Sequence, residues 1–315
     1  MARDYALDEA VNMSQRISII DLGTNTFNLL VVELNGGDSY EVLHSSKIAV
    51  GLGLGGIHKN RIADDAFQRG VKALKQFKDI SEGFNVVDIR GIGTSALRNA
   101  KNGEEFKQEV KDSLGIDIQI ISGDEEAKLI HKGAFLGYYP GGKTLIMDIG
   151  GGSTEFILCD EGGIIKSQSF EIGVARILQQ TEFADPYTED NCEQVRMYLD
   201  KALAKFLEGL EVDLLTGTSG SFETFYSLIN TKEYPPNEYQ RVDREELLKT
   251  LNQVIGSTYK SRVDNEFIIP IRERMLPIAA LKVKYIVEKI KCSQVLISPY
   301  SLKEGILNKC LQDVK

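Results

Sequence analysis

The chain has 315 residues, with 42% hydrophobic and 26% charged side chains, which is typical of a globular protein long enough for two domains. Its net charge of −9 argues against nucleic acid or an anionic membrane as a partner, and its apolar runs are too short to span a bilayer. Four cysteines without a C-x-x-C pair and no secretory signal predict free thiols in the cytoplasm, and the three histidines lack the spacing of zinc ligands.

The first half of the chain predicts antiparallel strands and then alternating helices and strands. Its opening stretch, MARDYALDEAVNMSQR, has no apolar core and is interpreted as an N-terminal extension. A helix is expected from about Asp64, because Phe67, Val71, Leu74 and Phe77 recur on one helical face. The other predicted elements are strands over Ile17–Leu22, Leu29–Leu34, Glu41–Val50, Val86–Ile92 and Asp117–Ile121, and helices over Glu104–Leu114 and Glu125–Leu136.

The strand pattern restarts near the middle of the chain, and more helices follow it. A surface turn is expected over Glu233–Gln240, between helices, because it contains the Pro-Pro-Asn sequence. The predicted strands are Leu145–Ile149, Glu155–Cys159, Ile164–Glu171, Val212–Leu215 and Val295–Ile297. The predicted helices are Asn191–Leu210, Glu273–Lys289 and a last one from Ser301.

The restart has an echo in the sequence itself. IIDLGTNTFNLLVV (Ile19–Val32) aligns with IMDIGGGSTEFILC (Ile146–Cys159), each an apolar strand, an aspartate, a glycine turn and a second strand. We therefore predict two similar α/β domains with a ligand site in the cleft between them. One domain is placed at residues 14–136, completed by a C-terminal helix at about 300–315, and the other at residues 137–299.

Another glycine-rich stretch, Gly137–Thr144, fits the phosphate-loop pattern G-x-x-x-x-G-K-S/T letter for letter. A functional phosphate loop follows a strand and opens a helix. Here the order is reversed, because a predicted helix precedes the motif and a predicted strand follows it. We interpret the stretch as a helix end and a connecting loop.

The stretch GLGLGG, Gly51–Gly56, fits the dinucleotide-binding pattern G-x-G-x-x-G. The next helix is expected only near Asp64, so the motif does not open a helix, and a lone match is weak. We interpret it as a flexible loop at the end of a hairpin.

The two echoed hairpins are candidates for binding an anion. Glycine permits close approach of the backbone, so successive N–H groups can form a concavity for phosphate. The alternative interpretation, a tight hairpin with turn-favouring residues, explains one copy better than two. Hydroxyl donors are available from Thr24, Thr26, Ser153 and Thr154.

Each turn also follows an aspartate, Asp21 or Asp148, whose charge would repel a phosphate. A divalent cation resolves this conflict, because Mg²⁺ binds carboxylate and phosphate oxygens together. The pair therefore predicts Mg²⁺, or another divalent cation, and a phosphoryl substrate.

These motifs resemble those of a known family. The two hairpin turns are similar to the phosphate motifs of the actin, sugar kinase and heat-shock chaperone superfamily. Together with TSALRNAKN, ISGDEEAKLI, GTSGSFE, RERMLPIAA and SPYSLKEGIL, they resemble the Ppx/GppA phosphatases, which are exopolyphosphatases and guanosine pentaphosphate phosphohydrolases. The resemblance runs from about Ile17 to Leu307. It implies two duplicated ribonuclease-H-like (actin-like ATPase) domains with a cleft between them.

The resemblance also implies roles for individual residues. Glu126 corresponds to the catalytic base for the attacking water, and Glu155 to a second acidic residue near that water. Asp21 and Asp148 correspond to metal-linked carboxylates, and Arg98 to an arginine that binds substrate phosphate. The implied phosphate-binding residues are Gly23, Thr24, Asn25, Gly150, Gly151, Gly152 and Ser153, with Gly217, Ser219 and Gly220 in a motif that binds distal phosphates or a nucleotide, or simply turns the chain.

The local pattern around Glu126 agrees with that role. Ser122 and Glu125 form an S-x-x-E capping box, which commits Glu125 to the helix start and leaves Glu126 to face the cleft. A helix N-terminus lowers the pKa of a carboxylate, so we expect Glu126 to be ionised at neutral pH. Ser301 and Glu304 form a second capping box, and Lys303 beside it is a candidate contact for a chain phosphate.

The predicted function is a metal-assisted exopolyphosphatase that acts on inorganic polyphosphate. Hydrolysis of guanosine pentaphosphate is the close alternative, because the site chemistry is the same. An ATP-dependent kinase, an actin-like filament protein and a non-catalytic sensor stay open as other classes. Longer members of the family carry further C-terminal helical domains, which we expect this chain to lack, so long-chain processivity and a homodimer built with those domains stay open.

Overall fold

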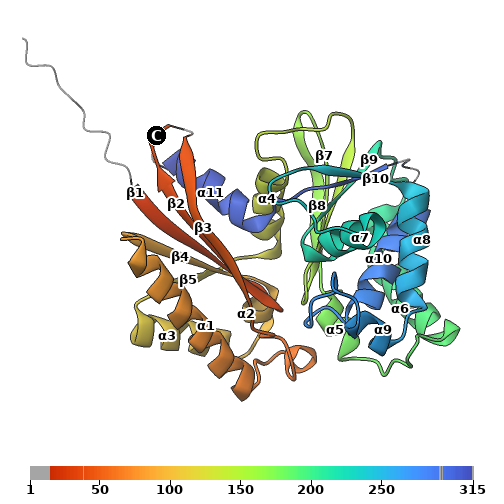
Figure 1. Ribbon diagram of the computed structural model, residues 1–315, viewed down its shortest axis with the longest axis horizontal. Helices are drawn as coiled ribbons and strands as arrows, with labels where there is room; N and C mark the ends of the chain where they lie inside the picture. Colours follow the sequence, from red (N-terminus) through yellow and green to blue (C-terminus); the bar gives the residue numbers. More distant parts are fainter. Residues whose placement is uncertain (1–14, 38, 291, 293, 314–315) are drawn as a thin grey trace, which may run out of the picture.

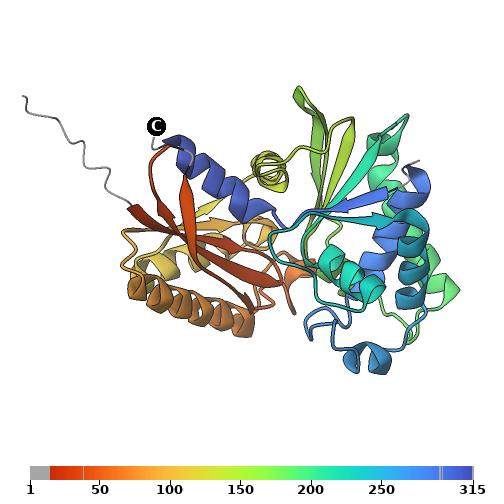
Figure 2. The same cartoon turned by 45° about the horizontal axis from the view of Figure 1, so that its top comes forward.

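The computed structural model describes residues 15–37, 39–290, 292 and 294–313, arranged as two lobes side by side (Figures 1 and 2). The first lobe contains residues 15–134 and the C-terminal helix, and the second contains residues 144–297. The predicted N-terminal extension lies outside the described residues, apart from Gln15 and Arg16. The domain boundaries given above stay a prediction.

The first lobe is built on a five-stranded sheet in the order β3-β2-β1-β4-β5. β1 pairs antiparallel with β2 and parallel with β4. The strands are β1 (Gln15–Leu22), β2 (Thr26–Leu34), β3 (Tyr40–Ala49), β4 (Asp88–Gly93) and β5 (Asp117–Ile120). The helices are η1 (Ile57–Lys59), α1 (Asp64–Gly83), α2 (Ser95–Asn99), α3 (Gly103–Leu114), α4 (Gly123–Ala134) and α11 (Leu302–Asp313).

The second lobe is built on a six-stranded sheet in the order β10-β11-β9-β6-β7-β8. β6 pairs antiparallel with β7 and parallel with β9. The strands are β6 (Thr144–Ile149), β7 (Thr154–Asp160), β8 (Gly163–Phe170), β9 (Leu214–Thr218), β10 (Gln240–Asp243) and β11 (Gln294–Ile297). The helices are α5 (Val174–Leu178), α6 (Glu189–Leu207), α7 (Gly220–Asn230), α8 (Arg244–Ile255), α9 (Tyr259–Val263) and α10 (Leu276–Lys289).

The two sheets share one topology, which confirms the predicted duplication. Read from its β8 edge, the second sheet repeats the order of the first and adds β10 beyond it. The pairing of β2 with β3 slips between Val31 and Val32, and the pairing of β7 with β8 slips at the equivalent place, between Leu158 and Cys159. A shared irregularity of this kind indicates that the two sheets are copies in backbone detail as well as in strand order.

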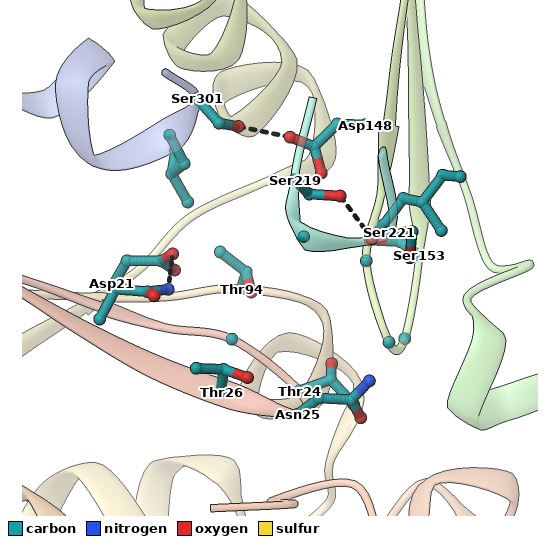
Figure 3. A pocket seen from close by; sticks show the side chains of 18 of the residues that line it. Asp21, Thr24, Asn25, Thr26, Thr94, Asp148, Ser153, Ser219, Ser221 and Ser301 are labelled. Carbon is teal, nitrogen blue, oxygen red and sulfur yellow. Dashed lines mark hydrogen bonds between the residues drawn. The ribbon is translucent and has the colours of Figure 1, made fainter. Parts of the chain in front are cut away.

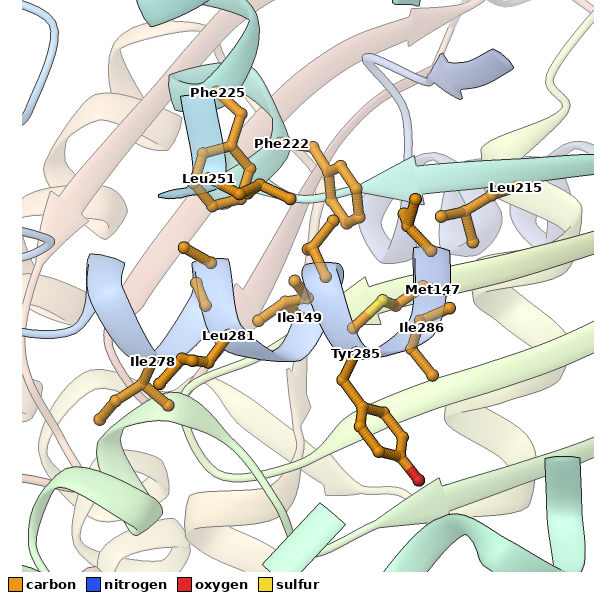
Figure 4. Packing of buried hydrophobic residues seen from close by; sticks show 14 of the residues in the cluster. Met147, Ile149, Leu215, Phe222, Phe225, Leu251, Ile278, Leu281, Tyr285 and Ile286 are labelled. Atoms are coloured by element: carbon orange, nitrogen blue, oxygen red, sulfur yellow. The ribbon is translucent and has the colours of Figure 1, made fainter. Parts of the chain in front are cut away.

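The core of the second lobe lies between its sheet and the apolar helix α10 (Figure 4). Met147 and Ile149 of β6 and Leu215 of β9 point toward α10, and Phe222 and Phe225 of α7 belong to the same apolar cluster. Burial of these side chains supplies the main stabilisation of the lobe. Because β6 is anchored in this way, the turn after Asp148 is held on a rigid base.

Helices α4 and α11 cross closely where the lobes meet. A methyl group on Gly133 would lie 1.8 Å from the carbonyl oxygen of Ser301, and one on Gly305 would lie 1.9 Å from that of Leu129. Only glycine permits backbones to approach this closely. Ile130 of α4 and Ile306 of α11 share an apolar cluster with strands of both sheets. Helix α4 is therefore packed against α11 and against strands of both sheets.

Most predicted elements are confirmed, with boundaries shifted by a few residues. Residues 137–143 of the phosphate-loop match lie in the loop between α4 and β6, and Thr144 begins β6, so its interpretation as a connector is confirmed. The turn over Glu233–Gln240 leads into β10, so the prediction that a helix follows it was wrong. Sequence patterns did not predict the short elements α2, α5 and β10. None of the helices in the described residues is both long and apolar enough to cross a membrane.

Candidate functional site

A cavity of about 210 Å³ lies between the turns of the two hairpins (Figure 3). Asp21, Thr24 and Asn25 line it from the first hairpin, and Asp148 and Ser153 from the second. The predicted site residues that line it are Asp21, Gly23, Thr24, Asn25, Glu126, Asp148, Gly150, Gly151, Gly152, Ser153, Glu155, Ser219 and Gly220. Arg98 and Gly217 are not among the lining residues.

The first turn is supported by the loop that carries GLGLGG. Gly51 N–H donates to the carbonyl of Asn25 at 2.8 Å, and Gly53 N–H donates to that of Thr24 at 3.0 Å. The motif is therefore a loop, as predicted, and it packs against the turn. Beyond the turn, the amide Nδ2 of Asn28 donates to Oδ2 of Asp21 at 3.0 Å. Burial raises the pKa of Asp21 to about 7, although this hydrogen bond opposes the rise.

The second turn presents its aspartate between two hydroxyl groups. Oδ2 of Asp148 accepts a hydrogen bond from Thr218 Oγ1 at 2.6 Å and another from Ser301 Oγ. Burial raises the pKa of Asp148, and these two hydrogen bonds oppose the rise. Ser301 directly precedes α11, and its backbone N–H donates to Glu304 of that helix at 2.9 Å. The predicted capping box is thus half formed, and its serine hydroxyl belongs to the site instead.

The two turns interlock. A methyl group on Gly151 would lie 2.6 Å from Cγ of Asn25, and one on Gly152 would lie 2.7 Å from Oγ1 of Thr24. The second turn therefore has glycines where side chains of the first turn approach its backbone. This contact places both turns against a single cavity.

Glu126 lies in the first turn of α4 and is only 6% exposed. The cap of α4 is formed by Ser122, whose Oγ accepts from Glu125 N–H at 3.1 Å, while the Glu125 side chain pairs with Lys309 at 3.7 Å. Burial raises the pKa of Glu126 to about 7, and Arg98 opposes the rise. Our expectation of a lowered pKa was wrong, because loss of hydration outweighs the helix dipole at this depth. A carboxylate with this pKa is a better base at neutral pH than an ordinary one.

Arg98 lies behind Glu126. Its Nη1 donates to Oε2 of Glu126 at 2.7 Å and to the carbonyl of Ile121 at 3.1 Å. This contact orients the glutamate. The predicted role of Arg98 in binding phosphate stays a prediction.

Glu155 and the buried Lys282 form the back wall of the second turn. Glu155 accepts from Ser169 Oγ at 2.7 Å, and burial, together with the charge on Glu126, raises the pKa of Glu155 well above its usual range. Lys282 of α10 is fully buried and donates to Thr154 Oγ1 and to the carbonyl of Ile172. Burial lowers the pKa of Lys282 to about 7, and the charges of Glu155 and Asp148 oppose this. The sequence analysis did not identify Lys282 as a site residue. It belongs to no motif, and the only sign of its burial is that it lies among the apolar residues of α10.

The remaining wall of the cavity comes from the start of α7. Ser219 has a φ of +75°, a strained value for a residue other than glycine, and its Oγ donates to the carbonyl of Ile149 at 3.0 Å. Gly217 is buried in β9, where a methyl group would meet the ring of Phe222 at 2.2 Å, so packing alone requires glycine there. Lys47, Glu223, Arg272 and Lys303 also line the cavity.

The carboxylates of Asp21 and Asp148 fit the predicted Mg²⁺. Hydrogen bonds in the described residues reach only Oδ2 of each, so both Oδ1 atoms are available as ligands. Each carboxylate is one of the oxygen ligands that Mg²⁺ prefers. No set of three or more Asp, Glu, His or Cys side chains within the described ranges could hold a metal by itself. A cation held by this pair would take its other ligands from water and from phosphate oxygens.

Comparison with known proteins assigns the chain to a family. The model of the Ppx/GppA phosphatase family matches residues 30–313. The chain belongs to this family. Exopolyphosphatase 2 of Mycobacterium tuberculosis is 27% identical to it, over 92% of this chain and 97% of that protein. The guanosine-5'-triphosphate,3'-diphosphate pyrophosphatase of Vibrio cholerae is 28% identical over 96% of this chain, which spans 62% of the length of that protein.

A solved Ppx/GppA relative has the same architecture. The crystal structure of an exopolyphosphatase from Cytophaga hutchinsonii is 33% identical and superposes with a TM-score of 0.90, covering 96% of this chain and 99% of that one. The predicted family and the predicted two-lobed α/β fold are therefore confirmed. The roles predicted for individual site residues stay predictions.

Proposed function

We propose that this protein is an exopolyphosphatase, which releases terminal phosphate from inorganic polyphosphate by attack of water. The observation that carries the proposal is the position of Glu126. Its carboxylate lines the same cavity as the two glycine turns and the aspartates Asp21 and Asp148. A base, an anion cradle and a cation site within one cavity are the components of phosphoanhydride hydrolysis.

Each part of the cavity has a distinct task in this proposal. Backbone N–H groups of the turns around Gly23 and Gly151 bind the terminal phosphate. Mg²⁺ on Asp21 and Asp148 would neutralise charge on the phosphate oxygens when it is bound. Glu126 orients the water and accepts its proton, which contributes roughly 10²–10⁴-fold. Arg98 keeps the Glu126 carboxylate in place through the 2.7 Å hydrogen bond.

The test is release of phosphate from polyphosphate by the purified protein in the presence of Mg²⁺. Glu126→Gln is expected to lower kcat by about 10²-fold or more. The matched control is Glu125→Gln, which changes the neighbouring residue, paired with Lys309 away from the cavity, and is expected to leave kcat unchanged. Equal rates for the two variants would refute the role of Glu126.

The pH dependence offers a second check on the same residue. The base must be ionised, and the pKa of Glu126 is raised to about 7. We therefore expect kcat/KM of the wild type to rise with pH up to about 7 and then level off. Bound Mg²⁺ lowers the pKa of a nearby carboxylate, so saturating Mg²⁺ should move this rising limb of the pH profile to lower pH. A limb that moves upward with Mg²⁺ would contradict the assignment.

Guanosine pentaphosphate is the second candidate substrate. The relative from Vibrio cholerae is named for hydrolysis of this nucleotide, and Ser219, Gly220 and Arg272 line the cavity where a nucleotide would extend from the two turns. Competition between the two substrates for turnover, with the specificity constants of each, decides which one is preferred.

A further inference from the structure

The carboxylate of Glu171 joins the two lobes beside the cavity. Glu171 follows β8 in the second lobe, whereas α2 lies in the first lobe (Figure 1). Its Oε2 accepts from Asn99 Nδ2 at 2.7 Å and from Ser95 Oγ at 3.3 Å, both on α2. The same oxygen accepts from Nη2 of Arg176 on α5 at 2.5 Å. One carboxylate thus collects donors from both lobes.

Arg176 carries this contact to the second turn. It is only 6% exposed, and its Nε donates to the carbonyl of Gly152 at 3.0 Å. Its Nη1 donates to the carbonyl of Ile57 in the first lobe at 3.3 Å. The guanidinium therefore fixes the glycine turn, Glu171 and the first lobe at once.

On the other side, Glu171 faces Arg98. Nη2 of Arg98 lies 3.8 Å from Oε1 of Glu171, and Nη1 is hydrogen-bonded to Glu126. That Nη2 atom is buried, and within the described residues it has no hydrogen-bond partner. The guanidinium of Arg98 is thus placed between two carboxylates, one from each lobe. A small movement of Glu171 would complete the missing hydrogen bond.

We propose that Glu171 is a positioning residue, which holds Arg98, and through it Glu126, in the reactive arrangement only while the lobes are together. The inference rests on the proposed function, since it assigns Glu126 the part of base. Glu171 does not line the cavity, and Arg176 keeps its own hydrogen bonds to the carbonyls of Gly152 and Ile57, so in this proposal Glu171 acts on the orientation of Glu126 and the second turn stays in place. Separation of the lobes withdraws its carboxylate from α2 and leaves Arg98 with Glu126 alone.

A double-mutant cycle on kcat and KM tests this proposal. Glu171→Gln keeps the shape of the side chain and removes its charge, and it is expected to lower kcat about tenfold with KM changed less than about twofold. Because Glu171 acts through Arg98, the pair Glu171→Gln with Arg98→Lys should be no slower than Arg98→Lys alone. Glu193→Gln, which breaks a 2.8 Å surface pair with Arg196 in the same lobe, is the control and should keep wild-type kcat.

Several results would overturn the inference. These are an unchanged kcat in Glu171→Gln, a change confined to KM, or losses that add in the double variant. Melting temperatures are measured for every variant, and Glu171→Asp, which keeps the charge but withdraws it by one methylene, should give an intermediate kcat. It replaces Glu171→Gln if that variant does not fold.

A readout without turnover separates this inference from the proposed function. The side-chain ¹⁵N relaxation of Arg98 is compared between wild type and Glu171→Gln, and the guanidinium should become more mobile in the variant. Wild-type protein that releases no phosphate refutes the proposed function, whatever Arg98 does. Unchanged mobility of Arg98 refutes the role of Glu171, whatever the activity.

Discussion

The two hairpins at the cavity have the same strand pairing, but they differ in the residue that faces the aspartate. Asp21 pairs across its hairpin with Asn28, and Asp148 pairs at the equivalent position with Glu155. The first pair is an amide that donates to a carboxylate. The second pair is two carboxyl groups, with buried Lys282 behind them.

The two copies therefore have the same frame and different chemistry at the position that faces the aspartate. In the first copy, an amide satisfies the aspartate locally. In the second copy, Asp148 depends on hydroxyls of Thr218 and Ser301 and on the charge of Lys282, all from other elements. We therefore expect substitutions in neighbouring elements to affect the second hairpin more than the first.

The largest expected effect comes from the glycine of the second turn that meets the first. Gly151→Ala puts a methyl group 2.6 Å from Cγ of Asn25, so the turns must separate. A displacement of about 1 Å in an active site can lower kcat by about 100-fold, and we expect a loss of that order. Gly83→Ala is the control, because a methyl group there meets nothing within 4 Å. A wild-type rate for Gly151→Ala would show that the turns need not touch during catalysis.

A smaller effect is expected from Lys282, the buried cation behind the second hairpin. Lys282→Met keeps the length of an apolar stem and removes the charge that favours ionised Asp148. The Mg²⁺ concentration for half-maximal activity should rise roughly tenfold, within the range found for residues that support metal ligands. Lys284→Met, two residues along the same helix and paired with Glu288 at 3.9 Å, is the control. Similar Mg²⁺ dependence in both variants would contradict the role of Lys282.

The smallest expected effect is on the free energy of unfolding. It is tested by giving each hairpin the kind of residue that faces the aspartate in the other hairpin. A carboxyl whose folded pKa is raised, as for Glu155, binds more protons in the folded state, so stability falls as pH rises from its unfolded pKa to its folded pKa. Glu155→Gln should therefore stabilise the fold at about pH 9 more than at about pH 5. Asn28→Glu should destabilise it by about 1–3 kcal/mol, because it replaces the amide donor to Asp21 by a carboxyl group.

Unfolding by urea at both pH values measures these changes. The opposite order for Glu155→Gln, with the larger gain at acid pH, would mean that Glu155 is ionised in the fold. An unchanged stability in Asn28→Glu would mean that Asp21 does not need its amide partner.

Sequence patterns were sufficient for the hairpins, and the family resemblance added the predicted site residues, most of which line the cavity. The repeated aspartate and glycine letters lie within single strands and turns, and local rules describe these well. Rejection of the phosphate-loop match at Gly137–Thr144 needed only the order of elements. The start of α4 and the placement of Glu126 in the cavity followed from a local capping pattern as well.

The features that sequence patterns missed depend on tertiary packing. The pKa of Glu126 reflects burial against two lobes, and Ser301 reaches Asp148 across 153 positions of the chain. Glu171 and Arg176 carry no motif, and their meaning comes from contacts between lobes. Such distant contacts have no periodicity that a single sequence could reveal.

The crossing of the chain between the lobes has a mechanical consequence. The chain passes from α4 to β6 and returns from β11 to α11, and Ser298 Oγ donates to the carbonyl of Ala134 at 2.8 Å, so the two passages lie together. In Figure 1 they lie above the seam, with α2 and α5 below it. Two adjacent connections of this kind form a hinge, about which one lobe can rotate toward or away from the other. Glu171 contacts α2 and α5, on the side of the seam away from this hinge. A small rotation of the lobes therefore moves Glu171 further than it moves residues near the hinge.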